Sequence, residues 1–217
     1  MAQLVPISIF ISELEAALKR KDGYIMGAYG QNPKTGSLDL SVIKESSSWK
    51  STGWYYTQYN SGYTAAQKAK ALYWREHATR VWDCNGLAEG IYQIHTGINI
   101  NARARNNYAS WCNPKGSGII PADKRIPGAA VFYGTPAGSI HHVAYLWKPV
   151  DSNKPTGDWW LIEAKGVAYG VVQSKLSARK PDFWGYMTKY YDYSKSTEIK
   201  PRTTIEKGDK GNAVKEI

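Results

Sequence analysis

The segment spanning residues 83–88 constrains the fold most strongly, because it places a cysteine at the start of a predicted amphipathic helix. Apolar residues continue at helical spacing as far as Tyr92, and Gly97 supplies a stop. Asp83 is a favourable N-cap, so we expect Cys84 to lie among the free backbone N–H groups of the first turn. The positive end of the helix dipole lowers a thiol pKa from its free value of about 8.5. Cys84 is therefore predicted to be a nucleophile, and a buried structural thiol is the alternative.

Two predicted strands later in the chain carry the partners that such a nucleophile needs. Residues 139–146 form one strand with His142 near its start, and residues 159–164 form a second strand that contains Glu163. The linker between them is rich in proline, glycine and asparagine, which indicates a hairpin with an enlarged loop. Neighbouring antiparallel strands would bring His142 and Glu163 within side-chain reach. A nucleophile, a base and an orienting carboxylate are the parts of covalent acyl transfer; the alternative for Glu163 is a solvated strand residue.

These motifs together resemble the NlpC/P60 cysteine peptidases, which are papain-like enzymes that cut peptidoglycan stem peptides. The matching elements are Asp-Cys-x-Gly at 83–86, His-Val at 142–143, the polar residue before alanine at 163–164, and a Pro-Gly turn with an apolar strand at 127–133. The resemblance covers residues 73–172, and the remainder of the first 195 residues resembles a phage or prophage endolysin version of the domain. It implies an α+β, papain-like fold in which helices pack on an antiparallel sheet.

The resemblance also implies roles for individual residues. Cys84 matches the nucleophile, His142 the general base and Glu163 the third residue of the family. Three further residues are candidates for substrate binding: Asn85, which stands where the family usually has serine, Trp82, and Tyr73, which matches a tyrosine one helix-length before the nucleophile. Core packing is the alternative for the two aromatic residues. The third position is more often His, Asn or Gln, but a carboxylate also orients imidazole and favours its protonated form.

The activity implied by the resemblance is hydrolysis of the γ-D-glutamyl–diamino acid bond of stem peptides through an acyl-enzyme. The family also contains amidases, so N-acetylmuramoyl-L-alanine amidase activity on the same fold is an alternative. A catalytically silent wall-binding or phage structural module is a second alternative, from a different functional class.

The remaining histidines are weighed against His142. Adjacent side chains of a strand point to opposite faces, so only one of His141 and His142 can meet Cys84. The motif favours His142, and His141 is then a solvent-facing or substrate-contacting residue. His95 is expected to be structural and His77 a surface or packing residue. No HExxH, CxxC or calcium-loop pattern occurs in the sequence, so we expect no metal in the chemistry and no cofactor.

Cys112 is the second of the two cysteines in the chain. Tyr108 and Cys112 are four residues apart and would share a helix face, which predicts a buried thiol. A disulfide between Cys84 and Cys112 would consume the proposed nucleophile, so we expect both cysteines to be free.

Composition and charge limit the partners. The net charge of +10 favours anionic polymers such as peptidoglycan carboxylates and teichoic acid, with simple solubility as the alternative. Basic residues are spread along the chain, and no helix-turn-helix, zinc-finger or RNP pattern is present, so we expect no nucleic-acid partner. No segment approaches the roughly 18 apolar residues of a membrane span. Tyrosine and tryptophan outnumber phenylalanine, by 16 and 9 to 3, which suits grooves that bind glycans and peptides as well as core packing.

The chain divides into three predicted parts. Residues 1–193 form the catalytic domain, with a first helix from Ser8 that stops at residues 22–23 and a second helix capped by Thr64. We expect a third short helix near residues 101–111, strands across 128–172, one of them at 167–172, and an aromatic closing segment at 182–193. Residues 194–204 are a predicted linker. Residues 205–217 resemble the start of a peptidoglycan-binding module, which we expect to continue in the natural protein; an accidental charged tail is the alternative.

The sequence lacks a cationic segment followed by an apolar one, so we expect no secretory signal. The protein would then be made in the cytoplasm and reach the cell wall through a phage holin or on lysis.

Overall fold

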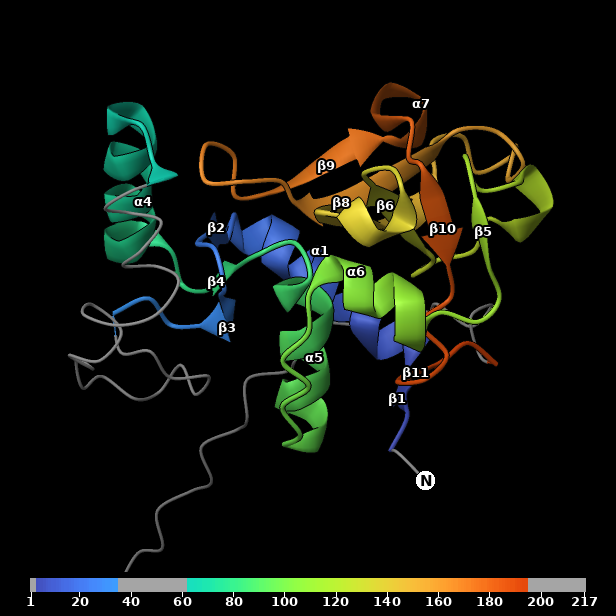
Figure 1. Ribbon diagram of the computed structural model, residues 1–217, viewed down its shortest axis with the longest axis horizontal. Helices are drawn as coiled ribbons and strands as arrows, with labels where there is room; N and C mark the ends of the chain where they lie inside the picture. The colour runs from blue at the N-terminus through green and yellow to red at the C-terminus, as the bar shows by residue number, and fades with distance from the viewer. Residues whose placement is uncertain (1–2, 35–61, 195–217) are drawn as a thin grey trace, which may run out of the picture.

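The computed structural model describes residues 3–34 and 62–194, and its fold is α+β (Figure 1). A six-stranded antiparallel sheet has the order β5-β10-β6-β7-β8-β9. The strands of this sheet are β5 (Lys115–Ser117), β6 (Ala130–Tyr133), β7 (His142–Pro149), β8 (Trp159–Ala164), β9 (Val171–Lys175) and β10 (Phe183–Gly185). The predicted class, helices packed on an antiparallel sheet, is therefore confirmed. The predicted module start and all but the first residue of the predicted linker lie outside the described residues.

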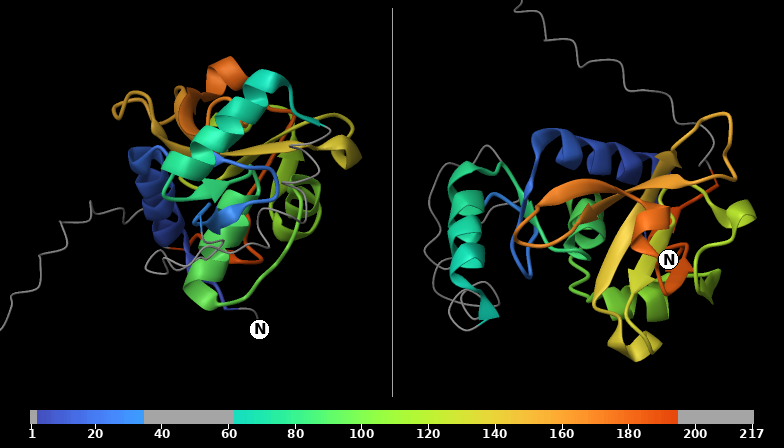
Figure 2. Two further views of the ribbon diagram at one scale, coloured as in Figure 1. Left: turned by 90° about the vertical axis from the view of Figure 1, so that its left-hand side faces the viewer. Right: turned by 90° about the horizontal axis from the view of Figure 1, so that it is seen from above.

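Helices cover the two faces of this sheet. The helices are α1 (Ile7–Arg20), α4 (Ala65–His77), α5 (Gly86–Thr96), α6 (Ala104–Asn106) and α7 (Leu176–Arg179), with a π-helix at Asn107–Trp111 and 3-10 turns at Ala122–Lys124 and Ala137–Ser139. Figure 1 shows α1 and α5 on one side of the sheet and α7 on the other, with α4 at the far edge of the molecule. The right-hand view of Figure 2, from above, also shows α4 apart from the large sheet.

The alternation of side chains along β7 separates two apolar clusters. Val143 and Tyr145 are fully buried in the larger cluster, which includes Cys84 and residues of α1 and α5. Ala144 and Leu146 are fully buried in a smaller cluster on the other face. This period of two is what a strand buried on both faces requires.

Two short sheets complete the fold. β2 (Gly23–Tyr24), β4 (Val81–Trp82) and β3 (Tyr29–Gln31) form one, with β4 in the middle, and β1 (Val5–Pro6) pairs in parallel with β11 (Tyr191–Asp192). The first of these sheets is important for the site, because β4 leads directly into the cysteine.

Local sequence signals account for most element ends. Helix α1 ends at Arg20. The next residue, Lys21, takes a left-handed conformation and lies one residue before the predicted stop at 22–23. Thr64 caps α4 through a reciprocal capping box with Gln67, as the predicted cap requires. Helix α5 ends at Thr96, and the predicted stop residue Gly97 is its C-cap, with a φ of 75°.

Two expectations about elements need correction. The predicted strand at 167–172 begins only at Val171, because Gly166 and Gly170 have positive φ and the Gly170 carbonyl accepts a bond from the Lys165 N–H. The preceding residues therefore form a turn. The predicted third helix is a one-turn α-helix that continues as a π-helix, so its residues do not keep a single helical register.

Candidate active site

Cys84 lies in the turn that joins β4 to α5. The Asp83 carboxylate closes this turn: its Oδ1 accepts the Gly86 N–H at 2.6 Å and its Oδ2 accepts the Gly27 N–H at 2.9 Å. The N-cap of α5 is Asn85 and not Asp83 as predicted, although the Asp83 carboxylate does accept the N–H of the first helical residue. Cys84, however, precedes the first helical residue, Gly86, instead of lying within the first turn.

Two glycines allow α5 to approach the backbone at the start of β3. A Cβ on Gly86 would lie 1.9 Å from the Ala28 carbonyl oxygen, and a Cβ on Gly90 would lie 1.8 Å from that of Tyr29. Neither distance is possible for a side chain, so only glycine permits this contact. The position of Cys84 is thus fixed by backbone packing from residues more than fifty positions earlier.

The Cys84 thiol is only 9% exposed, and this burial controls its ionisation. Burial raises the pKa of the thiol, and the neighbouring Asp83 charge raises it further; hydrogen bonds from the backbone N–H groups of Val143, Asn85 and Cys84 oppose these effects. The expectation of a lowered thiol pKa is therefore wrong for this state of the protein. A helix start stabilises a thiolate, but desolvation is the larger effect here.

The start of β7 runs past the thiol. Cys84 Sγ lies 3.8 Å from the carbonyl oxygen of His141, and the Val143 N–H is directed to the sulfur. The Tyr145 hydroxyl also donates to the Cys84 carbonyl at 3.2 Å. The backbone on both sides of His142 therefore contacts the cysteine. Within the part of the chain that the structure describes, the thiol makes no hydrogen bond to either histidine ring.

The side chains of His142 and Glu163 form a short hydrogen bond. His142 Nε2 lies 2.7 Å from Glu163 Oε2, and the Glu163 side chain has no solvent exposure. The predicted contact between these two side chains is confirmed, and the alternative of a solvated Glu163 is wrong. His142 also influences Asp83, the residue before the cysteine. Burial raises the pKa of the Asp83 carboxyl, and a charge on His142 is among the effects that lower it.

Two more side chains hold Glu163. The Ser174 hydroxyl donates to Oε1 at 2.5 Å, and an Arg179 guanidinium N–H donates to Oε2 at 2.9 Å. Burial alone would raise the pKa of Glu163, but the hydrogen bonds of His142 and Ser174 and the charges of His142 and Arg179 together hold it below its usual value. Glu163 is therefore a carboxylate at neutral pH.

The state of Glu163 fixes the tautomer of His142. A carboxylate is only an acceptor, so His142 Nε2 must carry the hydrogen of this contact. The lone pair of the neutral imidazole then lies on Nδ1, which has no hydrogen-bond partner among the residues described. Such a nitrogen is available as a base.

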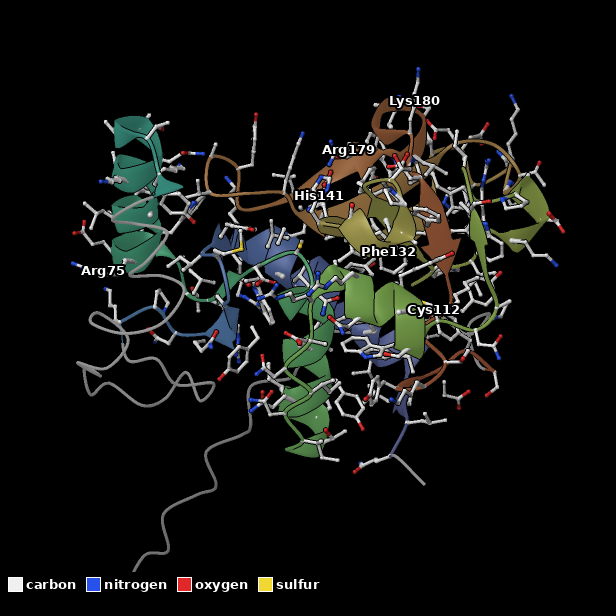
Figure 3. The ribbon with its side chains drawn as sticks, in the orientation of Figure 1. Arg75, Cys112, Phe132, His141, Arg179 and Lys180 are labelled. Atoms are coloured by element: carbon white, nitrogen blue, oxygen red, sulfur yellow. The ribbon has the colours of Figure 1, made fainter. Side chains whose placement is uncertain are left out.

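His141 occupies a different position. Its ring Nδ1 lies 3.2 Å from the Ser139 carbonyl, and its exposed side chain lines the pocket beside Cys84. Figure 3 shows His141 at the sheet end and Cys112 well away from it, beyond the π-helix. Sequence reasoning gave His141 the alternative of a substrate-contacting residue, and its place on the pocket wall is compatible with that role.

The pocket that contains Cys84 has a volume of about 460 Å³. Its walls are the turn after β2, the segment from Asp83 to the first turns of α5, the segment 99–105 that leads into α6, and the two residues Ile140 and His141. Cys84 is thus reached from a cavity of a size suited to a short peptide.

Asn85 and Glu89 hold one wall of this pocket together; we call this arrangement the Ala102 clamp. The Asn85 side-chain amide donates to the Ala102 carbonyl at 3.1 Å, and the Ala102 N–H donates to Glu89 Oε1. Asn107 Nδ2 donates to Asn85 Oδ1 at 2.9 Å. Asn85, predicted to bind substrate, lines the pocket but is 2% exposed, and its amide is used by the protein itself.

The other two predicted substrate-binding residues do not reach the pocket. Trp82 is 1% exposed because β4 is buried on both sides. Its Nε1 donates to Asp22 at 2.9 Å. Tyr73 is 45% exposed on α4 and stacks on His77. Figure 3 shows Arg75 of the same helix far from His141. Core packing, the stated alternative, is correct for Trp82, and Tyr73 is a surface residue.

Tyr24 is a neighbour of the cysteine that sequence reasoning missed. It is 6% exposed at the end of β2, and burial, followed by the nearby Cys84 and Asp83 charges, raises the pKa of its hydroxyl. β2 pairs with β4, so Tyr24 lies opposite Trp82, 58 positions along the chain. The residue would have been found only by predicting that long-range pairing.

Cys112 is a buried free thiol, as predicted. It is 5% exposed, its Sγ donates to Asn107 Oδ1 at 3.5 Å, and burial raises its pKa to about 12. Both cysteines are free. Across residues 3–34 and 62–194, no cluster of three histidine, cysteine or acidic side chains is placed to hold a metal ion, and no helix has the length and apolarity needed to cross a bilayer.

Comparison with known proteins gives two structural likenesses. No protein-family model and no curated protein sequence matches the chain. The NlpC/P60 domain of the peptidoglycan hydrolase SagA is similar over 57% of this chain and 97% of that domain, with 22% identity and a TM-score of 0.35. The P60 domain of antigen MAP1204 from M. avium subspecies paratuberculosis is similar over 83% of this chain and 96% of that one, with 19% identity and a TM-score of 0.40.

Proposed function

We propose that this chain hydrolyses peptidoglycan stem peptides, with Cys84 as nucleophile, His142 as general base and Glu163 as the group that orients the base. The observation that carries the proposal is the 2.7 Å contact between His142 and the buried, ionised Glu163. The backbone next to His142 in turn contacts the Cys84 thiol. A base held by a carboxylate beside a helix-start cysteine is the arrangement that acyl transfer by a thiol requires.

The first chemical step starts from a protonated thiol, because burial raises the pKa of Cys84. The thiol proton passes to His142 Nδ1 as the sulfur attacks the amide carbonyl carbon, and Glu163 stabilises the imidazolium that forms. A hydrogen bond between Sγ and Nδ1, which the described structure does not contain, forms when substrate fills the pocket, since catalytic hydrogen bonds are completed in the Michaelis complex.

The developing oxyanion needs hydrogen-bond donors at the same place. The backbone N–H groups of Cys84 and Asn85 are directed to the sulfur, whereas the N–H of Gly86 is already used by Asp83. These two N–H groups are the donors that we assign to the oxyanion. His142 then protonates the leaving amine as the C–N bond breaks. Water gives a proton to Nδ1, attacks the thioester and releases the acid, and the proton returns to Cys84.

The substrate class follows from the motif resemblance and from charge. The Asp-Cys-x-Gly and His-Val motifs resemble those of NlpC/P60 peptidases, which act on stem peptides, and the γ-D-glutamyl–diamino acid bond is the proposed point of cleavage. A net charge of +10 increases the encounter rate with anionic wall polymers.

Mass spectrometry of muropeptides tests the proposal. Purified cell walls are digested with the wild type, with Cys84→Ala, and with Cys112→Ala as the matched control at the other buried thiol. We expect new termini at the γ-D-glutamyl–diamino acid bond with the wild type and Cys112→Ala and none with Cys84→Ala. Termini at L-alanine released from muramic acid would show that the cleaved bond is the one that an amidase hydrolyses. Products with Cys84→Ala, or none with the wild type, would contradict the proposal.

A further inference from the structure

Two arginines belong to the lining of the pocket that contains the cysteine. Arg103 and Arg105 both line the cavity that contains Cys84, and both side chains are exposed. We propose that Arg105, together with Arg103, forms a carboxylate subsite that selects stem peptides whose γ-linked D-glutamate keeps a free α-carboxylate over peptides in which that group is amidated. This inference rests on the proposed function of the Cys84 site.

The acidic groups of the pocket are engaged by the backbone. Both oxygens of Asp83 accept N–H groups, from Gly86 and Gly27, and Glu89 Oε1 accepts the Ala102 N–H. Arg105 makes no ion pair with any residue that the structure describes. The exposed Arg105 guanidinium can therefore offer its charge to the contents of the pocket, and an anionic group is the ligand that this charge favours.

The arginines are held by the fold. The Ala102 clamp, made by Asn85 and Glu89, fixes both backbone groups of the residue before Arg103. Ala104, between the two arginines, is 4% exposed and belongs to the same apolar cluster as Cys84. With fixed backbone on both sides, less conformational entropy is lost when the guanidinium groups bind a ligand.

The chemistry of a γ-linked glutamate matches this arrangement. Its scissile carbonyl belongs to the side chain, so the α-carboxylate remains as a separate anion on the acyl part, joined to the attacked carbon by a short saturated chain. Guanidinium groups bind carboxylates through paired, charge-assisted hydrogen bonds. A primary amide carries no charge and offers one acceptor oxygen, so amidation would weaken binding at this subsite.

Kinetics on paired substrates test the inference. Synthetic L-Ala-γ-D-Glu-diamino acid peptides with an α-carboxylate or an α-amide are compared for the wild type, Arg105→Gln, and Lys154→Gln, an exposed lysine in the β7–β8 loop. We expect the wild type and Lys154→Gln to prefer the acid by about tenfold or more in kcat/KM, the size of one charged hydrogen bond. Arg105→Gln should lose this preference through KM, with kcat and cleavage of the amide nearly unchanged.

The outcomes separate this inference from the proposed function. Equal rates on both peptides with the wild type, or an equal loss on both with Arg105→Gln, would overturn the subsite and leave the hydrolase intact. If the wild type cleaves neither peptide, calorimetry with Cys84→Ala decides. Tighter binding of the acid that Cys84→Ala/Arg105→Gln abolishes would support the subsite without hydrolysis, whereas equal binding of acid and amide would overturn it.

Discussion

Replacing Glu89 by glutamine should stabilise the protein at alkaline pH. Glu89 is 8% exposed in α5; burial raises its pKa from 4.5 to about 7, with a further contribution from Asp83, and the Ala102 N–H opposes the shift. The folded protein therefore holds this proton more tightly than the unfolded chain does. The stability that comes from protonated Glu89 is present in full below pH 4.5 and is lost as the pH rises to about 7.

The size of the effect follows from the shift. The difference between 4.5 and about 7 corresponds to about 3 kcal/mol, since one pKa unit is worth about 1.4 kcal/mol. Glutamine has no charge to desolvate, and its side-chain oxygen can still accept the Ala102 N–H. We therefore expect Glu89→Gln to raise the free energy of unfolding by about 2–3 kcal/mol at pH 8 and by much less at pH 4.5.

Urea unfolding followed by tryptophan fluorescence between pH 4.5 and 8 measures this difference. Glu76→Gln is the matched control, because Glu76 is exposed on α4 and its replacement removes the same charge from the surface. If Glu89→Gln follows the wild type at every pH, or is less stable at pH 8, the reasoning about the clamp is refuted.

Three further perturbations test the site and its support. Glu163→Gln should lower kcat by about 10²-fold with little change in KM, because the amide no longer holds the His142 imidazolium; unchanged kcat in steady-state kinetics would argue against the pair. Gly90→Ala should cost about 2 kcal/mol in urea unfolding, since its Cβ would lie 1.8 Å from a carbonyl oxygen, whereas Gly138→Ala, in open space, should be neutral; equal effects would contradict the packing. Because burial raises the pKa of Cys84, iodoacetamide should modify it at least about tenfold more slowly than free cysteine at pH 7.5, and an equal or faster rate would show that the thiol is activated.

Features governed by local spacing were predictable from the sequence. The Thr64 capping box, the Asp83 turn and the bounds of β8 at Trp159–Ala164 each depend on neighbours a few residues away. The contact of His142 with Glu163 was predictable as well, because the two strands are consecutive and antiparallel.

Features set by distant segments were not predictable. The high pKa of the Cys84 thiol results from burial against β7, and burial depends on tertiary packing, while the helix dipole depends only on local structure. Trp82 was assigned to the pocket and is in the core, since β2 and β3 flank its strand. Tyr24 was missed for the same reason. The clamp on Ala102 joins α5 to a segment whose role has no sequence signal.

The choice between the two adjacent histidines tests the central claim most directly. Stem-peptide hydrolysis is measured for His142→Ala and His141→Ala. The first variant removes the imidazole that contacts Glu163, and the second removes an imidazole from the pocket wall. We predict that His142→Ala loses about 10²-fold or more of kcat and that His141→Ala retains most of it. Loss of activity in His141→Ala with hydrolysis preserved in His142→Ala would contradict the account.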